Sequence, residues 1–150
     1  MKTKKAQIDN FLSQSHIAVA GYSVKSKKFG NEVFNSLKKK GYVVFPINPA
    51  GGLTPDDDKI YDNLSTLPDE VKAIYIAAKP EITQKIIKEA LELRFTHFWV
   101  QQFSDNAEVE KMLTNIDEKV LGQCILMHTQ PKGIHKFHWW VVKMIGRLPA

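Results

Sequence analysis

The segment from residue 17 to residue 49 constrains the possible fold most strongly, because it predicts a β-α-β unit. An apolar run over residues 17–20 stops at Gly21 and predicts a strand, and a helix is predicted to open near Asn31. A second apolar strand ends in the sequence Pro-Ile-Asn-Pro at residues 46–49. A strand, a glycine-containing loop, a helix and a second parallel strand form a unit that binds nucleotides at its loop.

The details of this unit depart from the dinucleotide-binding pattern GxGxxG. Gly21 and Gly30 are far apart in the sequence, and three lysines lie between them: Lys25, Lys27 and Lys28. The second strand ends at Asn48, where an NAD-binding unit carries an Asp or Glu that holds the ribose diol. The unit therefore predicts a phosphate-rich ligand that is held without the usual dinucleotide contacts.

The remainder of the chain continues the alternation of strands and helices. Three further strands are predicted over residues 73–78, 97–100 and 124–127. One helix is predicted to begin at Pro80, and another is predicted to be capped by Ser104 or Asp105. This order predicts an α/β fold, namely a Rossmann-like three-layer α/β/α arrangement around a five-stranded, mainly parallel sheet.

Two helices and one loop complete the expected layout. Ile8, Phe11 and Leu12 have helical spacing and predict an N-terminal helix that packs on the sheet. Prolines and glycines, which interrupt helices and strands, are frequent over residues 48–58 and predict a surface loop. In the helix that begins at Pro80, four apolar residues are predicted to form the buried side: Ile82, Ile86, Ala90 and Leu93.

The composition favours a single cytoplasmic domain over residues 1–150. A chain of this length buries roughly two thirds of its unfolded surface without disulfides, and Cys124 is its only cysteine. We expect no signal peptide and no membrane-spanning segment, because the N-terminus lacks an apolar core and no apolar run is long enough. The net charge of +5 is concentrated at the two ends of the chain, which suits an anionic ligand, nucleic acid or a membrane surface.

In an open parallel sheet, ligands bind beyond the carboxyl ends of the strands. The candidate binding residues are those that follow the strands: Gly21, Tyr22, Ser23, Lys25, Lys27, Lys28, Gly30, Pro46, Asn48, Pro49, Ala78, Lys79, Pro80 and Gln101. They include amides, hydroxyls and lysines but no carboxylate. Because acid-base chemistry and metal binding usually need a carboxylate, histidine or thiolate, this set predicts ligand binding without catalytic residues or a metal.

The same strand ends resemble a known family, the CoA-binding domain at the start of the succinyl-CoA synthetase alpha subunit, and especially its small stand-alone bacterial relatives. The resemblance runs from about residue 16 to residue 127. Its marks are VAGYS at residues 19–23, GYVVFPINP at 41–49, Tyr61 with Leu64 and Leu67-Pro68, and FWVQ at 98–101.

The resemblance implies a Rossmann-like fold that takes CoA or an acyl-CoA. It places Gly21, Tyr22 and Ser23 along the diphosphate, and Asn48 and Pro49 on the adenosine side. The chain departs from the relatives in two places. Lysines stand where the relatives often have arginine, which exchanges a bidentate phosphate contact for a point charge, and Gln102-Phe103 follows Gln101 where the relatives often have a glycine, which narrows the crevice.

The C-terminal segment departs most from the relatives. A helix is predicted over about residues 132–147, with Phe137, Trp139 and Trp140 on an apolar arc too wide for a solvent-exposed element. We expect it to be buried or to form a homodimer contact, and we favour this over nucleic-acid stacking by its aromatic and basic residues. Three histidines accompany it, His128, His135 and His138, and we favour a packing role for them over a metal site.

Four functions stay open at this point. The first is a small CoA-binding or acyl-CoA-binding protein that acts as a sensor, carrier or regulatory module through an adenine-containing ligand. The second is an enzyme that processes acyl-CoA with His128 or His135 as a base. The third is an NAD(H)-type regulatory or redox protein, and the fourth is a scaffold with a vestigial crevice.

Overall fold

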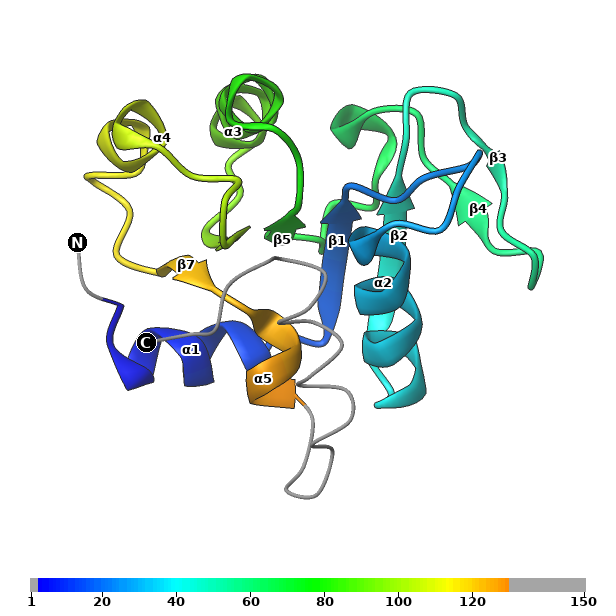
Figure 1. The fold of residues 1–150 in the computed structure, drawn as a ribbon, viewed down its shortest axis with the longest axis horizontal. Coiled ribbons are helices and arrows are strands. Elements are labelled where there is room, and N and C mark those ends of the chain that lie inside the picture. Colours follow the sequence, from blue (N-terminus) through cyan, green and yellow to red (C-terminus); the bar gives the residue numbers. More distant parts are fainter. Residues whose placement is uncertain (1–2, 130–150) are drawn as a thin grey trace.

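A five-stranded parallel sheet organises the chain. The computed structural model describes residues 3–129 (Figure 1). The strands lie in the order β2-β1-β5-β6-β7, and every neighbouring pair is parallel. Their bounds are β1 His16–Ala20, β2 Val43–Ile47, β5 Ala73–Ile76, β6 His97–Gln101 and β7 Lys119–Gln123. The predicted parallel sheet is confirmed.

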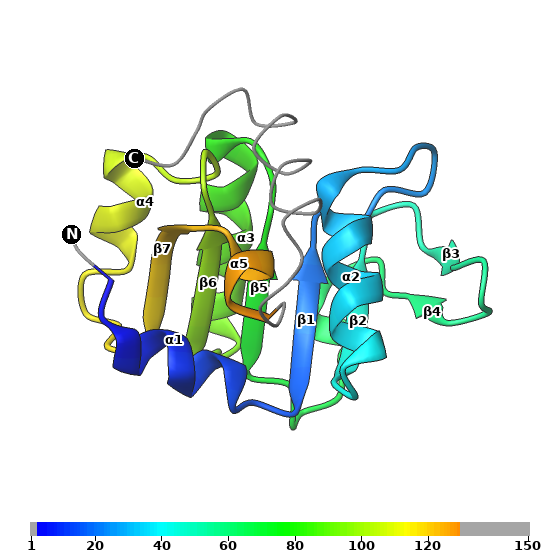
Figure 2. The same cartoon turned by 60° about the horizontal axis from the view of Figure 1, so that its bottom comes forward.

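Helices cover both faces of this sheet, which confirms the three-layer Rossmann-like arrangement. One face is covered by α1 (Lys5–Leu12), α2 (Phe29–Lys39) and α5 (Ile125–Thr129). The other face is covered by α3 (Pro80–Glu92), α4 (Ala107–Met112) and the short helix η1 (Leu64–Thr66). Figure 2 shows α1, α2 and α5 in front of the strands and α3 and α4 behind them.

The strands are apolar along their length because both faces are covered. Successive side chains of β1 enter opposite layers: Ile17 and Val19 pack under α2, and Ala18 packs under α3. Among the described residues, the largest fully buried side chain is Trp99, whose Nε1 donates to the Gln123 carbonyl at 3.0 Å. The ring of Phe11 meets Trp99 edge to face at 5.4 Å, which ties α1 to the sheet as its spacing predicted.

The predicted fifth strand is wrong in position. The strand is β7, residues Lys119–Gln123, and residues 125–127 lie in α5 instead. A short apolar run fits a buried strand and a buried helix equally well, so its periodicity could not separate the two. The true strand was inconspicuous because it begins with a lysine, Lys119, which is only 7% exposed and donates from Nζ to the Ile116 carbonyl at 2.6 Å.

Two details of the helices also differ from the predictions. The cap of α4 is Asn106, whose Oδ1 accepts from the Val109 amide at 2.9 Å, and not Ser104 or Asp105. The buried stripe of α3 consists of Thr83, Ile87 and Ala90. Of the residues predicted for that stripe only Ala90 is fully buried, while Ile86 and Leu93 are half-buried and Ile82 is 46% exposed.

The segment predicted as a surface loop contributes to a small hairpin. Strand β3 (Gly52–Leu53) pairs antiparallel with β4 (Lys59–Ile60). Figure 2 shows this hairpin projecting beyond the β2 edge of the sheet. A parallel bridge between Ile47 and Tyr61 then returns the chain to the end of β2.

Some expectations concern residues beyond those that the structure describes. The predicted helix over about residues 132–147 lies outside residues 3–129, as do His135 and His138. The homodimer contact and the single domain over residues 1–150 therefore stay predictions. Within the described residues, no helix is long and apolar enough to cross a membrane, and no group of three or more His, Cys, Asp or Glu side chains is placed to hold a metal ion.

Candidate functional site

A cavity lies at the carboxyl ends of the central strands. The chain passes from β1 to β2 on one side and from β5 to β6 on the other, so the strand order reverses between β1 and β5. Ligands bind at such a switch point in open α/β sheets. The cavity there has a volume of about 430 Å³, and it is lined by residues that follow β1, β2 and β5 and by one side of α3.

Two glycines bring the elements around this cavity into close contact. A Cβ atom on Gly30 would lie 2.2 Å from the Gly21 carbonyl oxygen, so α2 packs with its first turn directly against the end of β1. Gly21 has a φ of +123°, and a Cβ there would lie 2.3 Å from the Ala77 carbonyl oxygen beyond β5. Although far apart in the sequence, the two glycines perform the close-approach role that clustered glycines perform in the dinucleotide pattern.

Two asparagines hold the loops that border the cavity. The Asn31 side chain accepts from the Ser23 amide at 2.8 Å and donates to the Ser23 carbonyl at 2.9 Å. Asn48 Nδ2 donates to the Tyr22 carbonyl at 2.8 Å, and its Oδ1 accepts from the Ala50 amide at 2.9 Å. Asn48 therefore shapes the site by joining the β1 and β2 loops, and Asn31, which was not among the predicted site residues, fixes the β1 loop to α2.

Replacing Asn31 with alanine is expected to lower the free energy of unfolding by about 1–3 kcal/mol, because two partly buried hydrogen bonds to Ser23 are lost. Urea denaturation followed by circular dichroism measures this change. Asn35→Ala is a matched control, since Asn35 is exposed on the same helix. Equal stability of the two variants would contradict this role of Asn31.

The cavity brings together eight of the predicted site residues: Gly21, Tyr22, Ser23, Lys28, Asn48, Pro49, Ala78 and Lys79. Two others, Lys25 and Lys27, line a neighbouring cavity of about 400 Å³ between the β1 loop and the β3–β4 hairpin. Tyr22 and Ser23 line both cavities. The lysines of the β1 loop are thus divided between two adjoining cavities.

The remaining predicted site residues do not line either cavity. Gly30 packs against Gly21, and the Pro46 carbonyl accepts from the Tyr61 amide at 2.9 Å. Pro80 is the first residue of α3. Gln101 is buried under α5, where its Oε1 accepts from the Tyr75 hydroxyl at 3.0 Å and the Ile125 amide at 3.4 Å.

The structure corrects the expectation that no carboxylate borders the site. Asp62 and Glu89 line the main cavity, together with Asn63, Leu64, Ile82 and Ile86. Asp62 directly follows Tyr61, which the bridge to Ile47 holds beside the end of β2. Glu89 is a half-buried residue of α3. Sequence reasoning missed these residues because none follows a main strand directly. One feature of the sequence could have indicated the apolar residues of the cavity: α3 carries more isoleucines than its buried stripe can accommodate.

Acidic residues of the hairpin influence the residues at the neighbouring cavity. Burial raises the pKa of the Tyr22 hydroxyl, and the carboxylates of Asp56 and Asp58 raise it further, against the effect of Lys38. Asp58 also pairs with Lys38 of α2, and this contact raises the pKa of the lysine. Tyr22 consequently remains a neutral hydroxyl beside the lysines at neutral pH.

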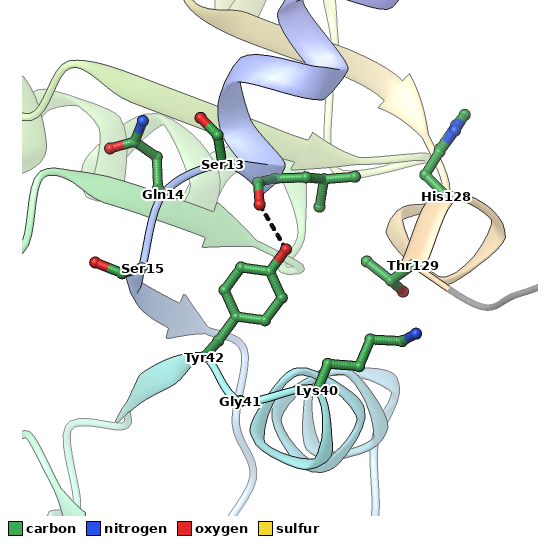
Figure 3. Close-up of a pocket in the computed structure, with 9 residues that line it drawn as sticks. Ser13, Gln14, Ser15, Lys40, Gly41, Tyr42, His128 and Thr129 are labelled. Carbon is green, nitrogen blue, oxygen red and sulfur yellow. Dashed lines mark hydrogen bonds between the residues drawn. The ribbon is translucent and has the colours of Figure 1, made fainter.

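A third cavity, of about 510 Å³, lies at the amino ends of β1 and β2 (Figure 3). It is bordered by the segment between α1 and β1, the end of α2, and α5. Tyr42 donates from its hydroxyl to the Leu12 carbonyl at 2.5 Å, and His128 and Thr129 lie on the α5 side. Partial burial lowers the pKa of His128, against the effect of Asp9. His128 therefore borders a different cavity from the main one at the carboxyl ends of the strands.

Comparisons with known proteins agree with this geometry. A family model described as a CoA binding domain matches residues 15–130. A conserved hypothetical protein from Pyrococcus furiosus is 30% identical, with a TM-score of 0.69 over 75% of this chain and 97% of that chain. A Thermus thermophilus protein is 26% identical, with a TM-score of 0.72 over 85% of this chain and 96% of that chain.

A longer protein shares the fold alone. The dinucleotide-forming acetyl-coenzyme A synthetase 1 of Ca. Korarchaeum cryptofilum, solved with phosphate and ADP, is 22% identical, with a TM-score of 0.59. The match covers 77% of this chain but 27% of that chain. No curated protein matches the chain.

Proposed function

The chain belongs to the CoA-binding domain family, and from this premise we propose that it binds CoA in the cavity above β1 and β5. Binding is the biochemical act in this proposal, and the protein serves as a sensor, carrier or regulatory module. Acyl-CoA is a ligand of the same class, because it shares the adenosine and diphosphate groups.

The observation that carries the proposal is the combination of cations and apolar side chains around one cavity. Lys28 and Lys79 line it together with residues of the β1 loop, and Leu64, Ile82 and Ile86 line it with apolar side chains. A nucleotide phosphate suits cations and the free amides of a helix start, and the flat face of an adenine suits aliphatic side chains. The neighbouring cavity, which shares Tyr22 and Ser23, offers Lys25 and Lys27 to a further phosphate of a large ligand.

The lining of the cavity does not support nucleophilic catalysis. Among the described residues that line it, none is a histidine or cysteine, and the Ser23 hydroxyl lies 3.4 Å from the Ser26 hydroxyl. A serine nucleophile needs an adjacent base, and the hydroxyl of Ser26 does not act as one for Ser23. His128, the base considered for acyl-CoA chemistry, borders the cavity at the opposite ends of the strands.

Asp62 favours a second candidate, an NAD(H)-type ligand. The carboxylate lies in the cavity close to the end of β2, the region from which an acidic residue contacts the ribose diol in NAD-binding proteins. The same carboxylate would repel a phosphate on that ribose, as in CoA. The two candidates therefore make opposite predictions for the replacement of Asp62.

We expect CoA to raise the melting temperature by several degrees at saturation. A ligand at 100 times its Kd adds about 2.7 kcal/mol, and each kcal/mol is equivalent to about 2–4 °C for a chain of this size. A thermal-shift panel of CoA, acetyl-CoA, NADH, ADP and ATP measures the shifts, and calorimetric titration gives the affinities.

Asp62→Asn separates the two candidates. The variant should bind CoA at least as tightly as the native protein and should bind NADH no better. Tighter binding of NADH than CoA by the native protein, weakened in Asp62→Asn, would favour the second candidate. A melting temperature that no adenine nucleotide changes would refute both and leave a scaffold.

A further inference from the structure

Charged side chains are distributed unequally between the two adjoining cavities. The main cavity is lined by two lysines and by two carboxylates, those of Asp62 and Glu89. The neighbouring cavity is lined by Lys25 and Lys27, and no Asp or Glu is among the described residues that line it. At neutral pH the charges of the main lining therefore cancel, whereas the neighbouring lining carries two positive charges.

Hydroxyl groups accompany the two lysines of the neighbouring cavity. Four residues of its lining carry one: Tyr22, Ser23, Ser26 and Thr54. Thr54 uses its hydroxyl within the hairpin, where the oxygen accepts from the Asp58 amide at 3.1 Å. Phosphate oxygens accept hydrogen bonds from hydroxyls and, more strongly, from ammonium groups. The composition of this lining therefore suits a phosphate group.

Both walls of the neighbouring cavity are held by contacts within the protein. One wall is the β1 loop, where the Asn31 side chain bonds to the amide and the carbonyl of Ser23. The opposite wall is the β3–β4 hairpin, which the ion pair between Lys38 and Asp58 joins to α2. This pair also compensates the charge of Asp58. A cavity with walls held in this way loses little conformational entropy when a ligand binds.

The phosphate groups of CoA differ in charge. Its 3′-phosphate is a monoester and carries about −1.5 to −2 charges at pH 7, more than either phosphate of the diphosphate. In the main cavity, Asp62 and Glu89 would repel this group. The neighbouring cavity adjoins the main one at Tyr22 and Ser23, and its lining is the more positive of the two. The charges therefore favour the neighbouring cavity for the 3′-phosphate.

From this distribution we propose that Lys25 and Lys27 bind the 3′-phosphate of CoA in the neighbouring cavity and make the protein selective for nucleotides that carry it. The inference rests on the proposed function. It explains how a polyanionic ligand tolerates two carboxylates in the main cavity, because its most strongly charged group lies outside that cavity. NAD(H) and dephospho-CoA lack this phosphate and gain nothing from the two lysines.

CoA and dephospho-CoA differ only in the 3′-phosphate, so titration calorimetry of the full chain with both ligands tests the inference. The native protein should bind CoA about tenfold more tightly, a modest factor because Lys25 and Lys27 are exposed and water screens their contacts. Lys25→Ala/Lys27→Ala should weaken CoA binding about tenfold and leave dephospho-CoA binding unchanged. The two ligands should then bind the variant equally.

Two further variants serve as controls. Lys25→Arg/Lys27→Arg keeps both charges and should retain the preference for CoA. Lys39→Ala/Lys40→Ala changes the net charge equally at the far end of α2 and should retain it too.

The two ligands also separate the possible failures. Equal affinity of the native protein for CoA and dephospho-CoA would overturn the inference and leave the proposed function intact. Equal losses for both ligands in Lys25→Ala/Lys27→Ala would assign the lysines to the diphosphate and also overturn it. A native protein that binds neither ligand would refute the proposed function itself.

Discussion

Replacing Gly30 with alanine is expected to lower the free energy of unfolding by about 3 kcal/mol or more and to remove ligand binding. The new Cβ would lie 2.2 Å from the Gly21 carbonyl oxygen and 2.5 Å from its carbonyl carbon. Both are backbone atoms at the end of a buried strand, so no side chain can move aside. The first turn of α2 would have to shift away from β1, and the β1 loop would shift with it.

A matched control for this variant is Gly41→Ala. Gly41 has a φ of +94°, and nothing lies within 4 Å of a Cβ atom built there. Its replacement costs only backbone strain, about 1–2 kcal/mol. Urea denaturation of both variants, followed by circular dichroism, gives the comparison. A Gly30→Ala protein as stable as Gly41→Ala would show that the approach of α2 to β1 is not limiting.

Removing the two lysines of the main cavity together is expected to weaken CoA binding about 100-fold and to leave the fold unchanged. Lys28 and Lys79 reach the cavity from the β1 and β5 loops, and both are exposed, so neither supports the core. Each charge-assisted contact to a phosphate is worth about 1.4 kcal/mol in such a setting, or a factor of ten. Titration of Lys28→Ala/Lys79→Ala with CoA measures the loss.

The salt dependence of binding and a second pair of lysines provide the controls. Affinity of the native protein should fall as NaCl is raised, and the double variant should show a shallower dependence because it has fewer charges to screen. Lys39→Ala/Lys40→Ala changes the charge equally at the far end of α2 and should bind CoA as the native protein does. Equal affinity of both double variants would refute the phosphate role of Lys28 and Lys79.

The fold was largely predictable because the local pattern of apolar and polar residues indicates the order of its strands and helices. Apolar runs separated by glycine, proline and amphipathic segments indicate alternating strands and helices, and a parallel sheet between two helical layers follows from that order. The prediction was wrong where the pattern is ambiguous. The apolar residues 125–127 suit a strand as well as a helix, and Lys119 hides the strand that precedes them.

The site was predictable in part for a similar reason. Gly21, Asn48 and Ala78 follow parallel strands, and the carboxyl ends of parallel strands meet at one edge of the sheet. The family resemblance, read from the same strand ends, is confirmed by the family model. The roles of the site residues stay predictions until a ligand is measured.

Helix α3 shows why the other side of the cavity was missed. It carries three isoleucines, and a helix buries one stripe of them. The sheet takes Ile87 and leaves Ile82 and Ile86 beside the cavity with Glu89. Periodicity alone does not decide which stripe faces the sheet when apolar residues lie on two adjacent stripes of the helix.

By itself, the sequence determined the order of the elements and which residues follow each strand, since both depend on interactions within a few residues of the chain. Only the tertiary structure decided that Gly30 meets Gly21, that Asp62 and Glu89 border the cavity, and that the β1-loop lysines divide between two cavities. These contacts join segments that are distant in the chain. Their distances depend on which strands are neighbours and how closely each helix packs on the sheet, which no local pattern specifies.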